Sequence, residues 1–259
     1  MPSGQHLVLR SSLDQELYSQ AKPFKTAIGR DHIMKIELEK LSPGDRYKLL
    51  AGFIVPRPIA FVSTCSPNGN NNLAPFSSFN YLGEDPPVIV LGLQIRDDGA
   101  LKDTTYNIRE NGEFVINFVD ESLVEQQNIC AIDFPPEIDE AKIAGITLEP
   151  SVAVQPKRIK QSPVAMECRR LVALELGPER IICIGEVLWI HARDGLIDPE
   201  TFYVNEELYR PIGRIYGSLY VRLNDVFELP RVMTYEDWKK MGEAPQATPV
   251  NWSRTGVKV

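Results

Sequence analysis

The chain has 259 residues, 43% of them hydrophobic and 24% charged, and a net charge of −7. This composition is ordinary for a globular protein with one large domain or two of normal size. The acidic balance argues against nucleic-acid and anionic-membrane binders, because both need a basic surface. No run approaches the roughly 20 apolar residues of a membrane helix. We therefore expect neither a nucleic acid nor a membrane among the partners.

The N-terminus has no basic segment followed by an apolar core, so we expect no secretory signal. The four cysteines, Cys65, Cys130, Cys168 and Cys183, show no metal-binding spacing. They are typical of free thiols in a reducing compartment, which predicts a cytoplasmic protein without a metal site. Cys168 and Cys183 lie in strand-like runs and are expected to be small buried hydrophobes.

Residues 1–32 are polar and weakly periodic, which indicates either a tail or an N-terminal arm that packs on a partner. A helix is then predicted from Ser42 to about Ala51. Ser42 is its N-cap, Pro43 takes the first helical position, and Gly52 ends it.

Strand signals follow. Pro58–Thr64 is rich in β-formers, and the Asn68-Gly69 turn predicts a returning strand over Leu73–Leu82. Pro75 within that strand favours an edge, a bulge or a strand end. The apolar run Val88–Leu93 predicts a strand that is buried on both faces.

The remaining elements are predicted from cap and turn signals. Helices are expected at Asp103–Asn111, Glu121–Ala131 and Pro136–Ala144, with a further short helix starting at Asp198. Strands are expected at Phe114–Val119 and Tyr216–Leu223, with a long antiparallel hairpin formed by Val164–Leu176 and Arg180–His191.

Many short strands, few helices and no βαβ alternation favour an antiparallel barrel with peripheral helices. We divide the chain into an N-terminal arm (1–32), a barrel domain (33–229) and a C-terminal extension (230–259). The extension carries Trp238 and Trp252, and such large aromatics suggest docking on the barrel or on a partner.

Two segments have the side chains needed to bind a ligand. At the start of the predicted helix at 103, unpaired N–H groups, the Lys102 ammonium and the hydroxyls of Thr104 and Thr105 suit a phosphate. The alternative is that Asp103 or Thr104 only caps the helix and Lys102 is solvated.

The second segment, Asn72–Phe79, combines Asn72, Ser77 and Ser78 with backbone near Pro75 that cannot complete a ladder. Such mixed contacts suit a flat aromatic ring with a polar edge. The alternative is a bulged strand with solvent-facing serines. Together the two segments suggest a flat, phosphorylated ligand, namely FMN.

The chain resembles the flavin reductase-like family from about Ser42 to Leu223. Seven motifs in order carry the resemblance: Pro56–Ala60, Ser63-Thr64, Asn72–Ser77, Asp85–Pro87, Lys102–Thr104 with Asn107-Ile108, Gly112–Asn117, and Ile184–Val187. It implies a mainly β fold, a six-stranded antiparallel FMN-binding split barrel, that forms a homodimer with FMN near the interface.

The resemblance also implies site residues. Those that would line the flavin are Ser63, Thr64, Asn72, Ala74, Ser77 and Ser78, and those that would help hold its phosphate are Lys102 and Thr104. We add Pro75 and Asp103 to the candidate cofactor site because they lie within the same two segments.

The implied activity is that of an NAD(P)H:flavin oxidoreductase, with hydride passing from NADH or NADPH to the flavin. The sequence has no Gly-x-Gly-x-x-Gly motif after a strand, so no separate Rossmann nicotinamide site is expected. His191 is the candidate catalytic residue, or else a surface histidine at a strand end. Arg57 is fixed between two prolines and contacts the flavin, a partner subunit or a structural acid. Tyr209 or Arg210 is a candidate to cover the flavin.

Four functions stay open. The first is a flavin reductase that supplies free flavin or a flavin-dependent monooxygenase. The second is a flavoredoxin-like FMN electron carrier, and the third an FMN enzyme acting on a specific small organic substrate. The fourth, a haem-binding split barrel, is disfavoured because the chain has only three histidines.

Overall fold

The computed structural model describes residues 33–96, 98–177, 179–224, 226, 236 and 239. The chain divides into two compact units, Met1–Arg46 and Tyr47–Val259. The predicted N-terminal arm and nearly all of the predicted C-terminal extension lie outside the described residues. The barrel described below belongs to the second unit.

The described part of the first unit contains the 3-10 helix η1 (Leu38–Lys40) and the beginning of helix α2 (Pro43–Phe53). The Ser42 hydroxyl accepts the backbone N–H of Asp45 at 3.2 Å, as an N-cap does. The predicted helix start at Pro43 is therefore confirmed.

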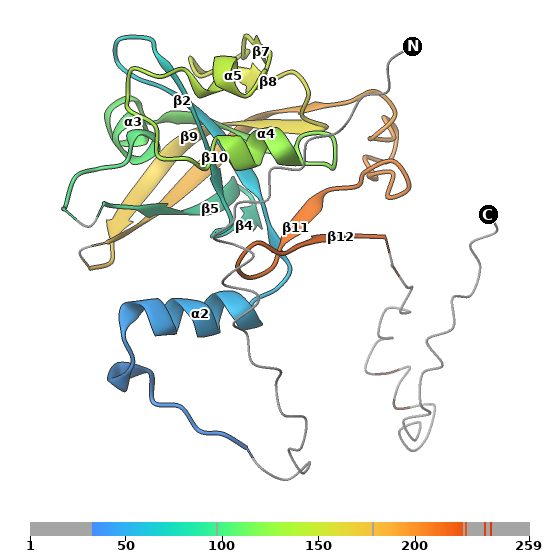
Figure 1. Ribbon diagram of the computed structural model, residues 1–259. Helices are drawn as coiled ribbons and strands as arrows, with labels where there is room; N and C mark the ends of the chain where they lie inside the picture. The colour runs from blue at the N-terminus through green and yellow to red at the C-terminus, as the bar shows by residue number, and fades with distance from the viewer. Residues whose placement is uncertain are drawn as a thin grey trace, which may run out of the picture. The chain divides into compact units, whose positions relative to one another are not determined.

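The main sheet is antiparallel and has seven strands in the order β3-β2-β6-β9-β10-β5-β4 (Figure 1). The strands are β2 (Ala60–Cys65), β3 (Asn71–Phe76), β4 (Phe79–Glu84), β5 (Pro87–Gln94), β6 (Glu113–Phe118), β9 (Val164–Glu175) and β10 (Arg180–Ala192). Two small sheets accompany it, β1 (Arg57–Pro58) with β11 (Ile212–Arg214) and β12 (Tyr220–Arg222), and β7 (Leu148–Glu149) with β8 (Arg158–Ile159).

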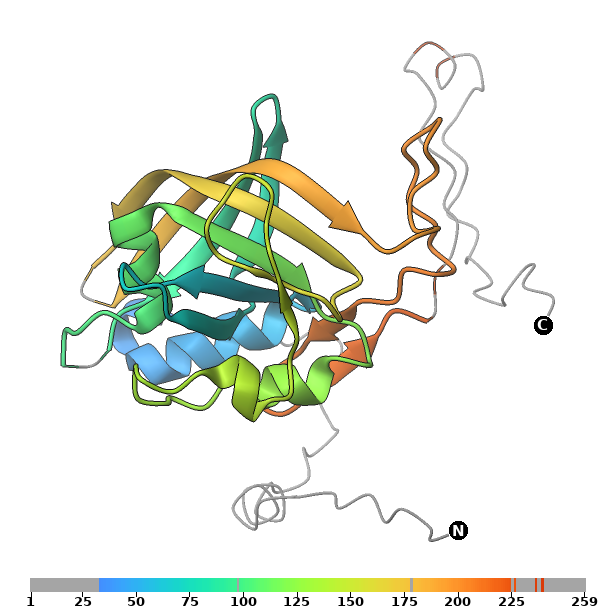
Figure 2. The ribbon, with the colours of Figure 1, turned by 90° about the horizontal axis from the view of Figure 1, so that it is seen from above.

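The sheet curls into a barrel, which Figure 2 shows from above. Its two ends approach each other where β3 comes close to β5, although no ladder joins these two strands. The N–H of Gly92 in β5 donates to the Ser78 carbonyl at 2.7 Å, which ties the segment between β3 and β4 to the barrel. The mainly β prediction and the long β9–β10 hairpin are confirmed.

The predicted strand Leu73–Leu82 is wrong as a single element, and this corrects the strand count from six to seven. It consists of β3 and β4, which lie at opposite edges of the sheet, with Ser77 and Ser78 crossing between them. The crossing segment can approach β5 closely because residue 92 is glycine: a Cβ there would lie 2.7 Å from Ser78 Cβ. The sequence hid this because the two strands follow each other without a turn motif.

Helix α3 (Asp103–Asn111) has the predicted limits and is closed by Gly112 at φ 71°. Helices α4 (Val124–Ile129) and α5 (Glu140–Ile143) are shorter than predicted. The segment at Asp198 is a turn rather than the predicted helix. The Asp198 carboxylate accepts the N–H groups of Glu200 and Thr201, so the expected cap is present but no helix continues from it.

Side chains alternate along β2, and each face of the sheet has its own core. We call the face with Ala60, Val62 and Thr64 the inner face and the face with Phe61 and Ser63 the outer face. The inner core contains Ala60, Val62, Phe79, Leu91, Ile108, Phe114, Cys168 and Cys183. The outer core contains Ile59, Phe61, Leu73, Val119, Leu123, Ala141, Ile146 and Ile159, with residues of α4 and α5 packed on it.

All four cysteines are buried free thiols, so the prediction for Cys168 and Cys183 is confirmed. Burial raises the pKa of Cys183 to about 11 and that of Cys168 further, so neither is a reactive thiolate at neutral pH. None of the helices within the described residues is both long and apolar enough to span a bilayer.

Candidate functional site

The predicted site residues lie on both faces of the sheet. Thr64 of β2 pairs with Asn72 of β3 on the inner face. On the outer face, one row of paired residues runs across four strands through Phe61, Asn117, Ala165 and His191. Ser63 lies on this outer face as well, so residues adjacent in sequence belong to different environments.

On the inner face, buried amides and hydroxyls join β2, β3 and α3. Asn72 Nδ2 donates to Thr104 Oγ1 at 2.8 Å and to Thr64 Oγ1 at 3.2 Å. Asn107 Nδ2 donates to the same Thr64 oxygen at 3.0 Å. Three predicted residues, Thr64, Asn72 and Thr104, are therefore brought together, and Asn107 is a member that the sequence did not identify. We call these four residues the inner network.

The inner network holds the N-terminus of α3, where a phosphate was expected. Lys102 is the N-cap residue, has extended backbone geometry, and makes no side-chain cap hydrogen bond. The N–H groups of the first turn are therefore left to other acceptors. The predicted alternative is that Asp103 or Thr104 caps the helix and Lys102 is solvated. In the structure Asp103 lies 3.7 Å from Arg96, and the Thr104 hydroxyl accepts Asn72 Nδ2. Arg96 is a second cation at this helix end, which the sequence did not suggest, and it is paired with both Asp103 and Asp133, the latter at 3.2 Å.

The remaining predicted flavin-lining residues lie at the end of β3 and in the crossing segment. Ala74, Pro75 and Ser77 are half-buried and Ser78 is exposed. The hydroxyl of Ser77 accepts Arg57 Nε at 3.2 Å. This segment continues directly from Asn72, which places it beside the inner network along β3.

Arg57 is a structural residue in this chain. Its guanidinium also donates to the carbonyls of Ala51, Ile54 and Ile215, the last at 2.6 Å. It therefore links the end of α2, the crossing segment and the loop after β11. The Tyr209 side chain packs on the barrel, because its ring lies 6.2 Å from that of Phe118. Burial is the main cause that raises the pKa of Tyr209, and the nearby charge of Asp120 adds to it.

On the outer face, Ser63 is engaged within the fold. Its hydroxyl donates to the Lys157 carbonyl at 2.6 Å and accepts Asn117 Nδ2 at 3.2 Å. Asn117 Oδ1 in turn accepts the N–H of Ile159 at 2.8 Å. These bonds fix the loop before β9, and they leave Ser63 2% exposed.

His191 is held by a buried carboxylate. Its Nε2 lies 2.6 Å from Glu167 Oε1, and Glu167 is 0% exposed. Glu167 also accepts the N–H groups of Val152 at 2.7 Å and Ala153 at 2.6 Å. Burial opposes its ionisation, but these three donors outweigh burial and lower the pKa of Glu167.

Within one chain, His191 is thus on the opposite face from Lys102, Thr104 and the rest of the inner network. The sequence missed Glu167, and a signal for it existed. An acid in the middle of a strand-like run, as Glu167 is in Val164–Leu176, either faces solvent or has buried donors. We call Ser63, Asn117, Glu167 and His191 the outer network.

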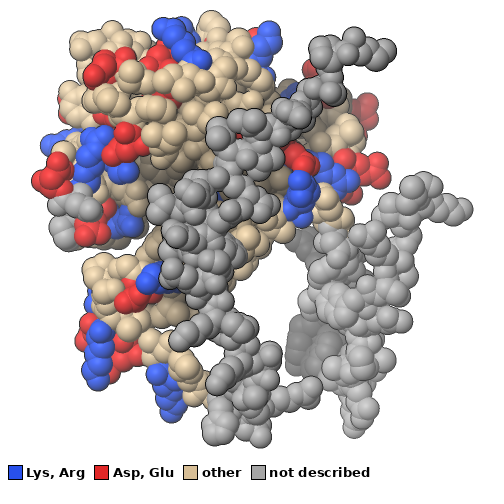
Figure 3. All heavy atoms as spheres, in the orientation of Figure 1, with Lys and Arg blue, Asp and Glu red and all other residues tan. Residues whose placement is uncertain are grey.

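On the face drawn in Figure 3, basic and acidic side chains are interspersed among the coloured residues, without an extended region of one sign. This face therefore offers no broad basic surface for an anion, and the uncapped end of α3 is a local anion site. A split barrel with such a helix end beside a half-buried polar strand end defines a class of barrel proteins that bind a flat, anionic ligand.

Comparison with known proteins specifies the family. Residues 52–212 match the model of the flavin reductase like domain, and the chain belongs to the flavin reductase-like family. An uncharacterized protein of Aquifex aeolicus (strain VF5) is 44% identical over 184 residues, which are 71% of this chain and 93% of that protein. The resemblance to this family and the split-barrel fold predicted from the sequence are confirmed.

Two solved structures are similar over their whole length. The 2-nitrobenzoate 2-nitroreductase NbaA of Pseudomonas fluorescens is 35% identical with a TM-score of 0.72, and the match covers 83% of this chain and 100% of that one. The nitrilotriacetate monooxygenase component B of Bacillus cereus is 34% identical with a TM-score of 0.73, covering 77% and 100%.

Proposed function

We propose that this protein is an FMN-binding, NAD(P)H-dependent flavin reductase. The observation that carries the proposal is the N-terminus of α3. It has no side-chain cap, it follows Lys102, and the inner network joins it to the polar strand β3. Family membership supports a flavin, and the choice of FMN depends on this anion site at a helix N-terminus.

The residues present fit a phosphorylated flavin. The N–H groups at the start of α3 and the Lys102 ammonium would hold the phosphate, and the half-buried segment Ala74–Ser77 with the exposed Ser78 would lie along the ring. Thr104 fits this role through its backbone N–H and its hydroxyl, since Thr104 Oγ1 only accepts from Asn72 and keeps its own proton to donate. Thr64 and Asn72 support the proposed site by fixing α3 against β2 and β3.

When bound, the flavin supplies the redox chemistry, accepting a hydride from a nicotinamide and passing electrons on. The chain's contribution is to position it. Asn72 sets the distance between β3 and α3, and Arg57 fixes Ser77 at the other end of the segment. Ser63 contributes through strand geometry, because its side chain is engaged on the outer face.

We further propose a homodimer with the flavin near its interface. Tyr81 is 73% exposed and Leu82 55%, and both lie on the β4–β5 hairpin that projects from the barrel in Figure 2. Exposed apolar side chains of this size favour a protein partner. The proposed catalytic role of His191 depends on this dimer, since within one chain His191 is on the other face of the sheet.

The proposed acceptor is free flavin or a flavin-dependent monooxygenase, supported by the likeness to a monooxygenase component B. A second candidate is an FMN enzyme that reduces a small organic substrate, favoured by the similar likeness to a nitroreductase. The two differ in one measurement. A flavin reductase consumes NAD(P)H faster when FMN or FAD is added, whereas a nitroreductase needs a nitroaromatic acid.

The first test is the absorption spectrum of the gel-filtered protein before and after anaerobic NADH or NADPH. Flavin bands that bleach support the reductase. Bands that persist indicate an electron carrier resembling flavoredoxin or a different donor. A protein that binds no flavin even with excess FMN contradicts the proposal.

The second test is Lys102→Ala. Loss of one charge-assisted phosphate contact should weaken FMN binding by about 1.5–3 kcal/mol. Lys142→Ala is the matched control: it removes a lysine paired with Asp139 at 3.2 Å, and Lys142 lies in α5 rather than α3. Equal FMN affinity in the two variants would exclude Lys102 from the phosphate site.

A further inference from the structure

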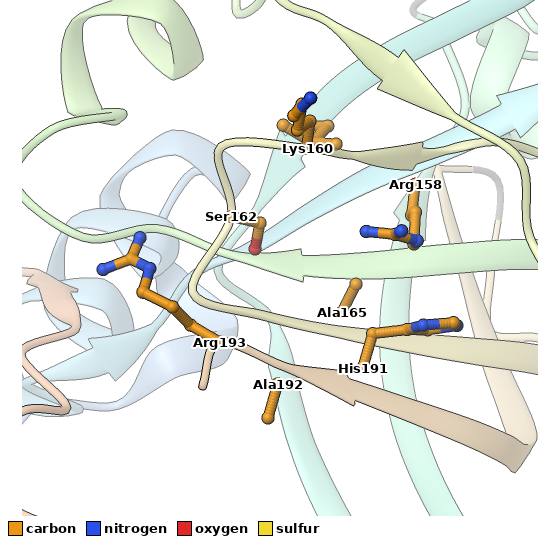
Figure 4. Close-up of a pocket in the computed structure, with 8 residues that line it drawn as sticks. Arg158, Lys160, Ser162, Ala165, His191, Ala192 and Arg193 are labelled. Atoms are coloured by element: carbon orange, nitrogen blue, oxygen red, sulfur yellow. The ribbon is translucent and has the colours of Figure 1, made fainter. Parts of the chain in front are cut away.

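A small hollow of about 120 Å³ lies on the outer face where β8, β9 and β10 meet (Figure 4). In Figure 4, Arg158 and His191 lie at one end, Arg193 lies at the other, and Ser162 and Ala165 lie between them. Its lining residues are Arg158, Ile159, Lys160, Ser162, Ala165, His191, Ala192 and Arg193.

The lining contains three permanent cations and a histidine, and it contains no acidic residue. The acids that pair with these groups are outside the lining. Arg158 and Lys160 share the single carboxylate of Glu149, at 2.6 and 3.2 Å. Each of these two cations therefore receives only part of one negative charge. On a chain with a net charge of −7, such a concentration of positive charge needs a reason.

Arg193 and His191 each have an acid of their own. Arg193 pairs with Asp120 at 3.1 Å, and its side chain is half exposed. His191 is bonded to Glu167, which is a carboxylate because its pKa is lowered, so His191 Nε2 is the donor in that bond. The ring nitrogen Nδ1 is the one not committed to Glu167.

Arg158 has donor capacity that the fold does not use. Its Nη2 is bonded to Glu149, but its Nε is buried and has no hydrogen-bond partner. A buried guanidinium donor without an acceptor is costly. The carboxylate of Glu149 at Nη2 therefore satisfies only part of the hydrogen-bonding capacity of Arg158.

We propose that this hollow binds one oxyanion group, a carboxylate or a phosphate. Its volume corresponds to about four water molecules, which suits a single such group rather than a whole nucleotide. Arginine is the side chain best matched to planar carboxylates and to phosphates. Within one chain this site is separate from the proposed flavin site, because the hollow is on the outer face and the inner network is on the other.

Binding to the purified full-length chain tests this by calorimetry, with sodium phosphate and sodium benzoate as separate probes up to about 10 mM. The double variant Lys160→Gln with Arg193→Gln should weaken binding about tenfold or more, since it removes two charged donors. The control is Lys40→Gln with Lys142→Gln, which removes two ion-paired surface lysines that do not line the hollow.

Proton–nitrogen NMR of the histidine side chains gives a second readout. The His191 signal is assigned by its loss in His191→Gln and should shift on saturation with the anion, while His6 and His32 should not. The anion that binds more tightly identifies the source, phosphate or carboxylate. If the double variant does not fold, Lys160→Gln alone replaces it, because Lys160 is 62% exposed.

The proposal is overturned by any of three results: neither anion binds, the double variant and its control bind equally well, or the His191 signal does not move. None of these readouts involves the flavin. A failure here therefore leaves the reductase proposal intact, and a failure of that proposal leaves this one intact.

Discussion

Ser63 and Thr64 are neighbours on β2, yet they belong to networks of different chemistry. Thr64 faces the inner network, which consists of neutral amides and hydroxyls. Ser63 faces the outer network, which contains the hydrogen-bonded pair of the Glu167 carboxylate and His191. A strand exposes alternate residues to opposite faces, so a sequence motif of two adjacent polar residues serves two sites rather than one.

This difference suggests that the inner and outer networks have different roles. A neutral network holds α3 at a fixed distance from the sheet without adding negative charge beside a bound phosphate. The charged network fixes the loop before β9 and orients His191 beside the basic hollow. Substitutions on the two faces should therefore have separable effects on flavin affinity and on stability.

The largest expected effect is from Glu167→Ala. It removes the acceptor of two backbone N–H groups and of His191, all of them buried or half-buried. We expect a loss of about 3–5 kcal/mol in the free energy of unfolding. Urea denaturation measures this loss. Glu149→Ala removes a more exposed acid, which pairs with Arg158 and Lys160, and it should lose clearly less stability. Equal losses would mean that burial does not distinguish the two acids.

The inner network should be more sensitive in flavin binding than in stability. Asn72→Ala removes two hydrogen bonds from a buried amide, which should cost about 1–3 kcal/mol of stability and also weaken FMN binding by loosening α3 from β3. The control is Asn80→Ala, at an exposed position of β4. FMN titration and urea denaturation on the same samples separate the two effects. Unchanged FMN affinity in Asn72→Ala would show that the inner network does not support FMN binding.

The sequence predicted much of this fold, because caps, turns and long β-runs are local signals. Helix α3, the hairpin β9–β10 and the start of α2 follow from such signals. The crossing of Ser77 and Ser78 between opposite edges of the sheet does not, because it depends on the distant Gly92. A local pattern also cannot show which strands become neighbours.

The site was predicted in the same uneven way. Thr64, Asn72 and Thr104 were identified together because they lie in motifs that the family shares. Asn107 lies in one of these motifs but was assigned no role, because its bond to Thr64 is made to another element. Arg96 and Glu167 were missed, since each acts through partners that are distant in sequence or on another element. The predicted list also contained residues of both faces, because a motif does not state which way each side chain points.

The pair Ser63→Ala and Thr64→Val tests the two faces directly. Each removes one hydroxyl, and each should cost about 1 kcal/mol of stability. Only Thr64→Val should weaken FMN binding, because only Thr64 supports Asn72 and Asn107. Fluorescence titration with FMN measures this. A weaker FMN affinity in Ser63→Ala alone would reverse the assignment of the faces.

The smallest expected effect is a difference in pH dependence between two buried acids, Glu167 and Glu140. Glu140 of α5 accepts the N–H of Leu73 at a long 3.3 Å. Burial is the main cause of its raised pKa, with Asp103 and Asp139 adding to it. Glu167 has the opposite shift, because its donors outweigh burial. An ionised glutamate therefore stabilises the fold at Glu167 in β9 and destabilises it at Glu140 in α5.

The signs follow from linkage. The pKa of Glu167 is lowered on folding, so its ionised form stabilises the protein above the unfolded value of about 4.5, and that contribution is lost as the pH falls through the folded pKa. The pKa of Glu140 is raised, so its stabilising contribution is present below about pH 4.5 and is lost as the pH rises through the folded pKa.

Glu167→Gln should thus be less stable than the parent chain at pH 7, with the difference in stability becoming smaller in acid. Glu140→Gln should match or exceed the parent at pH 7, with its advantage shrinking in acid. Urea denaturation between about pH 4 and pH 8 measures both differences, and parallel pH profiles for the two variants would show that the donors around Glu167 do not set its charge.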